Sequence, residues 1–163
     1  MPTPTHIALA NITLSTSDSS IIFSLIPNTY RDLILVISGS TTANADINLI
    51  FNSDTAANYS FVYMGGSGSG SGIFGAAGSQ GGIVLDGYFW RSSEISTCVI
   101  NIMDYSATDK HKTILSRNNV AGAGIDAFAN RYASLLAINV IEVRTVSQAF
   151  AAGTTIALYG IVS

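Results

Sequence analysis

The sequence has few charged residues. Only 10% of its 163 residues are Asp, Glu, Lys or Arg, whereas 48% are hydrophobic, and a soluble domain usually has about a quarter of its residues charged. Ser, Thr, Asn and Gly must therefore supply most of the polar surface. The apolar excess leads us to expect that part of the surface is buried against another subunit.

Basic residues are even fewer than acidic residues. Seven Lys and Arg stand against ten Asp and Glu, which gives a net charge of -3. The basic residues are scattered, apart from the run Lys110, His111 and Lys112. This pattern excludes nucleic-acid binding that depends on neutralising many phosphates.

Cysteine and histidine, the residue types that most often carry metal or nucleophilic chemistry, are nearly absent. The single cysteine, Cys98, excludes an internal disulfide and a cysteine zinc cluster, and we expect it to be a small buried hydrophobe. His6 and His111 are the only histidines, and neither has suitable partners nearby for a metal site or a serine triad. The acids fall mostly in turns and form no pair, so we expect no enzyme, no metal and no cofactor.

Long hydrophobic segments are also lacking. The start, Met1–Pro4, has neither the basic nor the apolar region of a signal peptide. The longest uncharged windows, residues 65–85 and 145–163, are broken by Gly, Ser, Thr and Gln, which makes them poor membrane helices. We expect a soluble protein that is made in a cytoplasm.

Short β-strands are the main pattern that is present. Leu33–Ile37 is apolar at every position, so both faces of that strand require cover, while Ile47, Leu49 and Phe51 alternate with other residues. Runs of this kind recur between Gly, Ser and Asn turns. They predict one domain over residues 1–163, an antiparallel, jelly-roll-like β-sandwich of roughly eight to ten strands, with a short N-terminal arm at about residues 1–6.

Two stretches of small residues interrupt the strands. Gly65–Gly72 alternates Gly and Ser and lacks the Lys of a phosphate-binding loop, so it predicts a mobile surface loop without a ligand. Asn118–Asn130, which contains Ala121–Gly124, predicts a second loop, and Tyr132–Arg144 predicts the strand after it.

One aromatic triplet, Tyr88-Phe89-Trp90, could form a platform on which a sugar stacks. In a strand, however, it places Tyr88 and Trp90 on one face and Phe89 on the other, and we favour core or subunit packing. The candidate subunit contacts are Ile34, Val36, Tyr88 and Trp90.

Several segments, read together, resemble a known family. They are Leu9–Ser15, Ile22–Leu33, Phe51–Asp54 with Asn58–Ser60, and Phe150–Ile161. Their order and spacing resemble small β-rich virion proteins of tailed bacteriophages, including cyanophages, which are described as capsid decoration (cement) or tail-fibre proteins. Where those relatives tend to have Gly after Phe51-Asn52, this chain has Ser53 and Ala56.

The resemblance implies a structural or adhesive role and no catalytic residue. We expect a non-enzymatic capsid decoration protein in the virion, a homotrimer that binds the major capsid protein on the outside of the phage head. The alternatives are a tail-fibre or receptor-binding domain that contacts glycans, and a carbohydrate-binding β-sandwich module. A fibre is expected to carry a rod segment, and none precedes His6 or follows Val162. The candidate capsid-contact arm comprises Pro2, Thr3, Pro4, Thr5 and His6.

Overall fold

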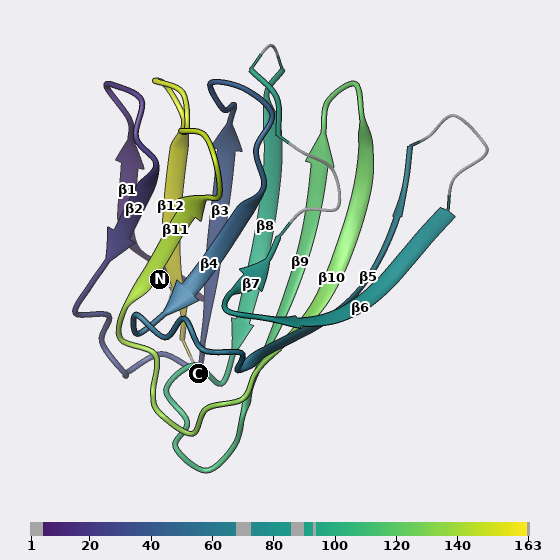
Figure 1. Ribbon diagram of the computed structural model, residues 1–163. Coiled ribbons are helices and arrows are strands. Elements are labelled where there is room, and N and C mark those ends of the chain that lie inside the picture. The colour runs from purple at the N-terminus through teal and green to yellow at the C-terminus, as the bar shows by residue number, and fades with distance from the viewer. Residues whose placement is uncertain (1–4, 68–72, 86–89, 93, 163) are drawn as a thin grey trace.

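The computed structural model describes residues 5–67, 73–85, 90–92 and 94–162. These residues form twelve strands in two antiparallel sheets (Figure 1). The predicted all-β sandwich is thus confirmed, with more strands than the eight to ten expected. Within these ranges no helix is long and apolar enough to span a membrane.

The larger sheet has eight strands in the order β1-β12-β3-β8-β9-β10-β5-β6. Their bounds are, in that order, His6–Thr13, Thr155–Ile161, Asp32–Gly39, Ser96–Met103, Lys112–Val120, Gly124–Tyr132, Tyr59–Gly66 and Ile73–Gln80. The smaller sheet has the order β2-β11-β4-β7, with bounds Ser20–Phe23, Ile141–Thr145, Ile47–Phe51 and Ile83–Val84. Figure 1 shows the smaller sheet in front of one half of the larger one, while β5 and β6 diverge from it.

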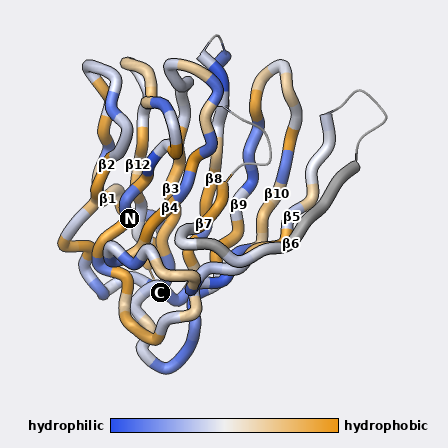
Figure 2. The backbone as a smooth tube through the Cα atoms, in the orientation of Figure 1, coloured by the Kyte–Doolittle hydropathy of each residue, from blue (hydrophilic) through white to orange (hydrophobic). Residues whose placement is uncertain are grey.

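The core lies between the two sheets and is mainly aliphatic. On β3, Leu33, Leu35 and Ile37 are fully buried and alternate with partly exposed residues. The facing strands β4 and β11 contribute a matching set of buried residues: Ile47, Leu49, Phe51, Ile141 and Val143. This alternation is the pattern of a strand with one face in the core. In Figure 2 hydrophobic segments lie along β3 and β4, and the loop between β8 and β9 is hydrophilic.

The predicted loop at Asn118–Asn130 is wrong. β9 continues to Val120, a tight turn follows, and β10 occupies Gly124–Tyr132 with hydrogen-bonded neighbours on both sides, β9 and β5. The turn uses Gly122 at φ 69, a backbone conformation in which L side chains are strained. The small residues of this segment thus belong to an inner strand of the larger sheet.

Other predicted boundaries also change. Gly65 and Gly66 complete β5, whereas residues 68–72 of the predicted loop lie outside the described residues. The predicted strand Tyr132–Arg144 is divided, because residues 133–140 form a loop before β11. Asn52 fastens this loop, since its amide donates to the Ala137 carbonyl and its side-chain oxygen accepts from the Val140 amide. Non-local hydrogen bonds of this kind leave no periodic signal in the sequence.

The turn after β4 holds Ser53 in a backbone conformation that usually favours Gly. Asn52 and Ser53 both have positive φ, 52° and 59°, and the Asp54 amide donates to the Phe51 carbonyl at 2.9 Å. Two central residues of positive φ define a type I′ turn. Asn tolerates that conformation well, and the hydrogen bonds of the Asn52 side chain hold the turn in place.

Candidate functional site

The outward face of β9, β10 and β5 combines small and large apolar side chains. On β10, Ala127 and Ala129 point outward and are too small to fill the space between the neighbouring strands. Four larger side chains rise around them with 42% to 67% of their surface exposed: Val62, Met64, Leu115 and Ile125. We call this surface the outer groove. It has a floor of alanine and walls that are mainly aliphatic.

Three shallow depressions lie in sequence along the outer groove. The first, of about 380 Å³, is lined by residues that include Ser60, Val62 and Arg131. The second, of about 450 Å³, includes Met64, Arg117 and Ala127 among its lining residues. The third, of about 420 Å³, lies at the β9–β10 turn and shares Gly66 and Ile125 with the second.

The groove follows β10, whose nine residues span about 27 Å at the usual strand rise. Every backbone position of β10 pairs with β9 or β5, so the groove presents only side chains to a ligand. Its shape therefore suits an extended molecule that lies along the strand.

Two arginines point from the groove toward solvent. Arg117 of β9 pairs in register with Ala127, and Arg131 of β10 pairs with Thr113. Arg131 donates two hydrogen bonds to Nδ1 of His111, at 3.2 Å from Nε and 2.7 Å from an Nη nitrogen. The two register positions on β9, Thr113 and Arg117, are four residues apart in the sequence, which places the arginines about 13 Å apart along the strand.

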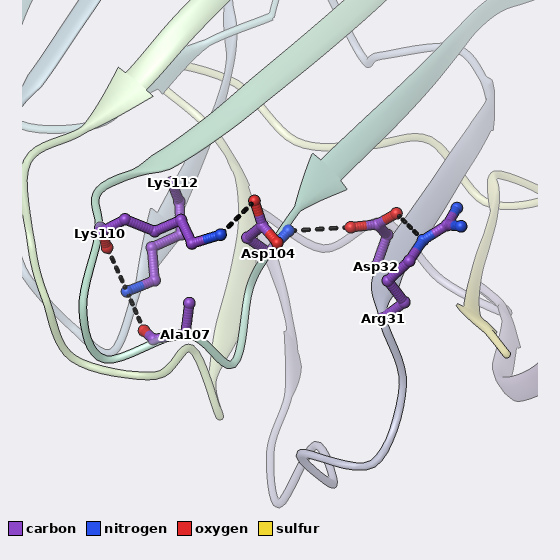
Figure 3. A network of polar contacts seen from close by, with 6 residues as sticks. All are labelled: Arg31, Asp32, Asp104, Ala107, Lys110 and Lys112. Atoms are coloured by element: carbon purple, nitrogen blue, oxygen red, sulfur yellow. Dashed lines mark hydrogen bonds and ion pairs between the residues drawn. The ribbon is translucent and has the colours of Figure 1, made fainter. Parts of the chain in front are cut away.

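The loop that carries His111 is fixed from within by a buried ammonium group (Figure 3). Lys112 is fully buried, and its Nζ donates to the Ala107 carbonyl at 2.6 Å, as Figure 3 shows. The same Nζ donates to the Ser134 carbonyl at 3.1 Å. Burial lowers the pKa of Lys112, although Asp109 opposes this shift. A buried charge is tolerated only when it is satisfied in this way, so Lys112 has a structural role at this end of the groove.

Polar contacts continue across the same end of the sheet. The Asp32 carboxylate accepts a hydrogen bond from the Asp104 amide at 2.9 Å and forms an ion pair with Arg31 at 2.7 Å (Figure 3). Lys110 pairs with the Asp104 carboxylate at 3.3 Å. These acids thus have cationic partners of their own and lie outside the outer groove.

Aromatic side chains support the groove from the inner side of the sheet. Tyr63 stacks on Phe128 with a centroid distance of 4.7 Å, and Phe61 lies 6.0 Å from Phe128. Offset ring pairs of this kind stabilise neighbouring strands. They hold β5 against β10 directly beneath the alanine floor.

A second aromatic cluster closes the lower end of these two strands. Tyr59 stacks on Tyr132 at 4.7 Å, and the Tyr132 hydroxyl donates to the Asp54 carboxylate at 3.1 Å. Asn58 also donates to this carboxylate and is the main reason why the pKa of Asp54 is lowered, with help from the Ala56 amide. Burial raises the pKa values of Tyr59 and Tyr132 above their ordinary range, so both hydroxyls stay protonated as donors.

The residues selected from the sequence do not gather at the outer groove. Trp90 is only 1% exposed, and its Nε1 donates to Asn118 at 3.1 Å, so its selection as a subunit contact is wrong. Ile34 and Val36 are partly exposed on the outer face of β3, and their role as contacts stays a prediction, as does the homotrimer. Tyr88 lies outside the described residues.

The proposed N-terminal arm falls mostly beyond what the structure describes. Pro2, Thr3 and Pro4 lie outside the described residues, while Thr5 is exposed and His6 begins β1. His6 pairs with Ile161 of β12. It therefore belongs to the sheet rather than to an arm.

The groove residues were missed because the sequence of β10 looks like a loop. The signal that could have found them is the alternation of Phe128, Asn130 and Tyr132 with Ala127, Ala129 and Arg131, which has the period of a strand. Gly124 and the alanines concealed it. Among the described residues no group of three or more His, Cys, Asp or Glu is placed to hold a metal ion.

Comparison with known proteins shows that the fold is similar to that of solved structures, but it does not assign the chain to a family. No known protein family and no curated protein matches the sequence. Among solved structures, exo-inulinase from Aspergillus awamori matches 96% of this chain with 16% identity and a TM-score of 0.50. An alginate lyase matches 93% of the chain with 7% identity and a TM-score of 0.33, and the marine alginate lyase from Aplysia kurodai matches 85% with 8% and 0.35.

These alignments cover different shares of the matched proteins. The chain spans 29% of the exo-inulinase, 77% of the first lyase and 72% of the second. At these identities the likeness shows the fold alone, and the two lyases, with TM-scores well below that of the exo-inulinase, carry no argument.

The exo-inulinase likeness nevertheless corrects two predictions. The likeness in fold is to part of an exo-inulinase, and this finding contradicts the prediction of a capsid decoration protein. The prediction that the chain is not an enzyme is contradicted by the same neighbour. The resemblance to phage virion proteins stays a prediction. The alternative of a carbohydrate-binding β-sandwich agrees better with the comparison.

Proposed function

We propose that this chain is a carbohydrate-binding β-sandwich that holds a glycan chain in the outer groove. The observation that carries the proposal is the groove itself, a row of three depressions along β10 with an apolar floor between polar and aliphatic walls. The likeness in fold to part of an exo-inulinase supports a carbohydrate as the ligand.

The side chains of the groove match the two kinds of surface that a sugar presents. The C–H faces of a sugar ring are apolar and pack on Ala127 and Ala129 between Val62 and Met64. Its hydroxyl groups require donors and acceptors at the edges. Ser60, Thr113 and Asn119 supply these from the outward positions of β5 and β9. A few placed polar groups around an apolar surface are typical of ligand sites.

The proposal is tested by filling the floor of the groove. Ala129→Trp places a large ring between Val62 and Leu115, and the matched control Ala157→Trp makes the same change on the outward face of β12. Trp is favoured in strands, so both variants should fold, which circular dichroism and thermal melting check. Binding is measured on a panel of immobilised neutral and acidic polysaccharides.

We expect the natural chain to retain at least one glycan class from this panel. Ala129→Trp should weaken that binding by about tenfold or more, equal to about 1.4 kcal/mol, and Ala157→Trp should leave it unchanged. If no polysaccharide binds, or if Ala129→Trp binds as well as the natural chain, the proposal is wrong.

A further inference from the structure

We infer that the glycan held by the outer groove is acidic, with carboxylate or sulfate groups on at least two of its sugar units. This inference rests on the proposed function and adds the chemical class of the ligand. It comes from the distribution of charge over the three strands that form the groove.

The groove is basic although the chain as a whole is acidic. The net charge of the chain is -3, yet the outward positions of β9, β10 and β5 include Arg117 and Arg131 and no acidic residue. These positions are, in strand order, Thr113, Leu115, Arg117 and Asn119, then Ile125, Ala127, Ala129 and Arg131, then Ser60, Val62, Met64 and Gly66. A surface of one sign on a protein of the opposite sign selects ligands by charge.

Both guanidinium groups are available to a ligand. Arg117 is exposed and has no hydrogen bond or ion pair with any described residue. Among the residues that the structure describes, the Arg131 side chain hydrogen-bonds only to His111, which leaves several of its five N–H donors open. A guanidinium group binds a carboxylate or sulfate through two parallel hydrogen bonds.

The spacing of the arginines sets the size of the ligand. They lie about 13 Å apart along the strand direction, since Arg117 is level with Ala127 and Arg131 lies beyond Ala129. A single sugar that rests on the floor contacts one of them, whereas a linear oligosaccharide along β10 contacts both. Affinity should therefore increase with chain length until both arginines are engaged.

An acidic peptide is the main competing ligand, and the sheet disfavours it. Extended peptides commonly bind by adding a strand to an open sheet edge. β10 is an inner strand whose backbone groups are used by β9 and β5. A peptide that lay over the groove would therefore gain no backbone hydrogen bonds from β10. A sugar does not need them, because its hydroxyl groups can bond to the polar side chains at the edges of the groove.

The test uses oligomers of galacturonate from one to eight units, with the fully methyl-esterified oligomers as their uncharged counterparts. Calorimetry should show that the acid binds at least about tenfold more tightly than the ester, and that the longer oligomers bind more tightly than the monomer. Arg117→Gln and Arg131→Gln should each weaken binding of the acid by about fivefold, the size of an exposed charge contact. Both variants should weaken binding of the ester less than binding of the acid, because the ester offers no charge to the guanidinium groups.

Arg144→Gln is the matched control, because it removes the same charge from β11 in the other sheet. It should leave the binding of every oligomer unchanged. Equal binding of acid and ester, with Ala129→Trp still abolishing both, would overturn the acidic ligand and leave the proposed function intact. Binding of neither oligomer, nor of any polysaccharide on the panel, would overturn both proposals. Binding of polyglutamate with the same dependence on Arg117 and Arg131 would replace the glycan with an acidic peptide.

Discussion

The outer face of the larger sheet differs between β3 and β10, although both are inner strands of that sheet. Over β3, Ile34 lies between Tyr159 and Asn101, and these neighbours leave it only partly exposed. On β10, Ala127 and Ala129 are small, so the larger side chains of the neighbouring strands β9 and β5 project above them and stay exposed. Both strands are hydrogen-bonded on both sides, yet the surface over β3 is even and the surface over β10 is hollow. The difference comes from the size of the outward side chains.

Their inner faces also differ, in the type of residue that they bury. Beneath β3 the core is aliphatic and faces the smaller sheet, whereas beneath β10 it contains aromatic rings and the polar residues Asp126 and Asn130. Aliphatic burial fixes the fold. The aromatic pairs around Phe128 keep β10 and β5 aligned where β5 begins to diverge from the smaller sheet (Figure 1). We therefore expect the half of the sheet around β3 to contribute most of the stability, and the half around β10 to provide the outer groove.

The largest effect on stability is expected in the half around β3. Leu35→Ala removes a fully buried side chain, and such changes lower the free energy of unfolding by about 2 to 5 kcal/mol. The corresponding truncation in the groove, Val62→Ala at a side chain that is 56% exposed, should cost less than about 0.5 kcal/mol. Urea denaturation of both variants measures the contrast. Equal losses would erase the distinction between the two halves.

A smaller effect is expected at the loop beside the groove. Lys112→Met removes the hydrogen bonds of a buried Nζ to the carbonyls of Ala107 and Ser134. Unsatisfied buried groups cost about 1 to 3 kcal/mol, which denaturation of this variant can resolve. Lys110→Met, at an exposed lysine paired only with Asp104, is the control and should be nearly neutral. A neutral Lys112→Met would show that the buried ammonium does not fasten the loop.

The lower end of β5 and β10 should respond to pH through Asp54. Its pKa is lowered in the folded chain, chiefly by Asn58, so the ionised carboxylate stabilises the fold above the ordinary pKa of about 3.9. That contribution is lost as the pH falls through the lower folded value. The stability difference between the natural chain and Asp54→Asn should therefore shrink on acidification. A difference that is constant with pH would remove Asp54 from this account.

The smallest effect on stability is expected in the groove. Arg117→Gln and Arg131→Gln change exposed side chains and should each shift the free energy of unfolding by less than about 0.5 kcal/mol, while they weaken ligand binding. Thermal melting next to the binding measurement checks this separation. A large loss of stability would mean that these arginines hold the sheet together rather than serve a ligand.

The sequence predicts one of the two contrasted strands and misses the other. Leu33–Ile37 is recognisable because every residue is a good strand former, and its core face is confirmed by burial. β10 is missed because Gly124 and two alanines have little strand preference of their own. They are held in a strand by hydrogen bonds from β9 and β5, which are distant in the chain or beyond a turn. Tertiary pairing here overrides local preference.

The candidate site could not be predicted for the same reason. A groove forms where small residues of one strand lie beside larger residues of two others, and this depends on register across β9, β10 and β5. The triplet that ends at Trp90 attracted attention as an aromatic cluster, but Trp90 is a core residue that bonds to Asn118. The composition of a segment does not reveal which of its faces is covered.

The most direct test of the central claim is to map the amide chemical shifts of the natural chain during titration with a galacturonate octamer. If the octamer binds in the outer groove, amide chemical shifts should change along β9 and β10, from Thr113 to Arg117 and from Ile125 to Arg131. The amides of β3 and β12 should not change. The shifts at Ala127 and Ala129 should be the largest, since the sugar rings lie on them. Shifts confined to β3 and β12, or to the smaller sheet, would contradict it.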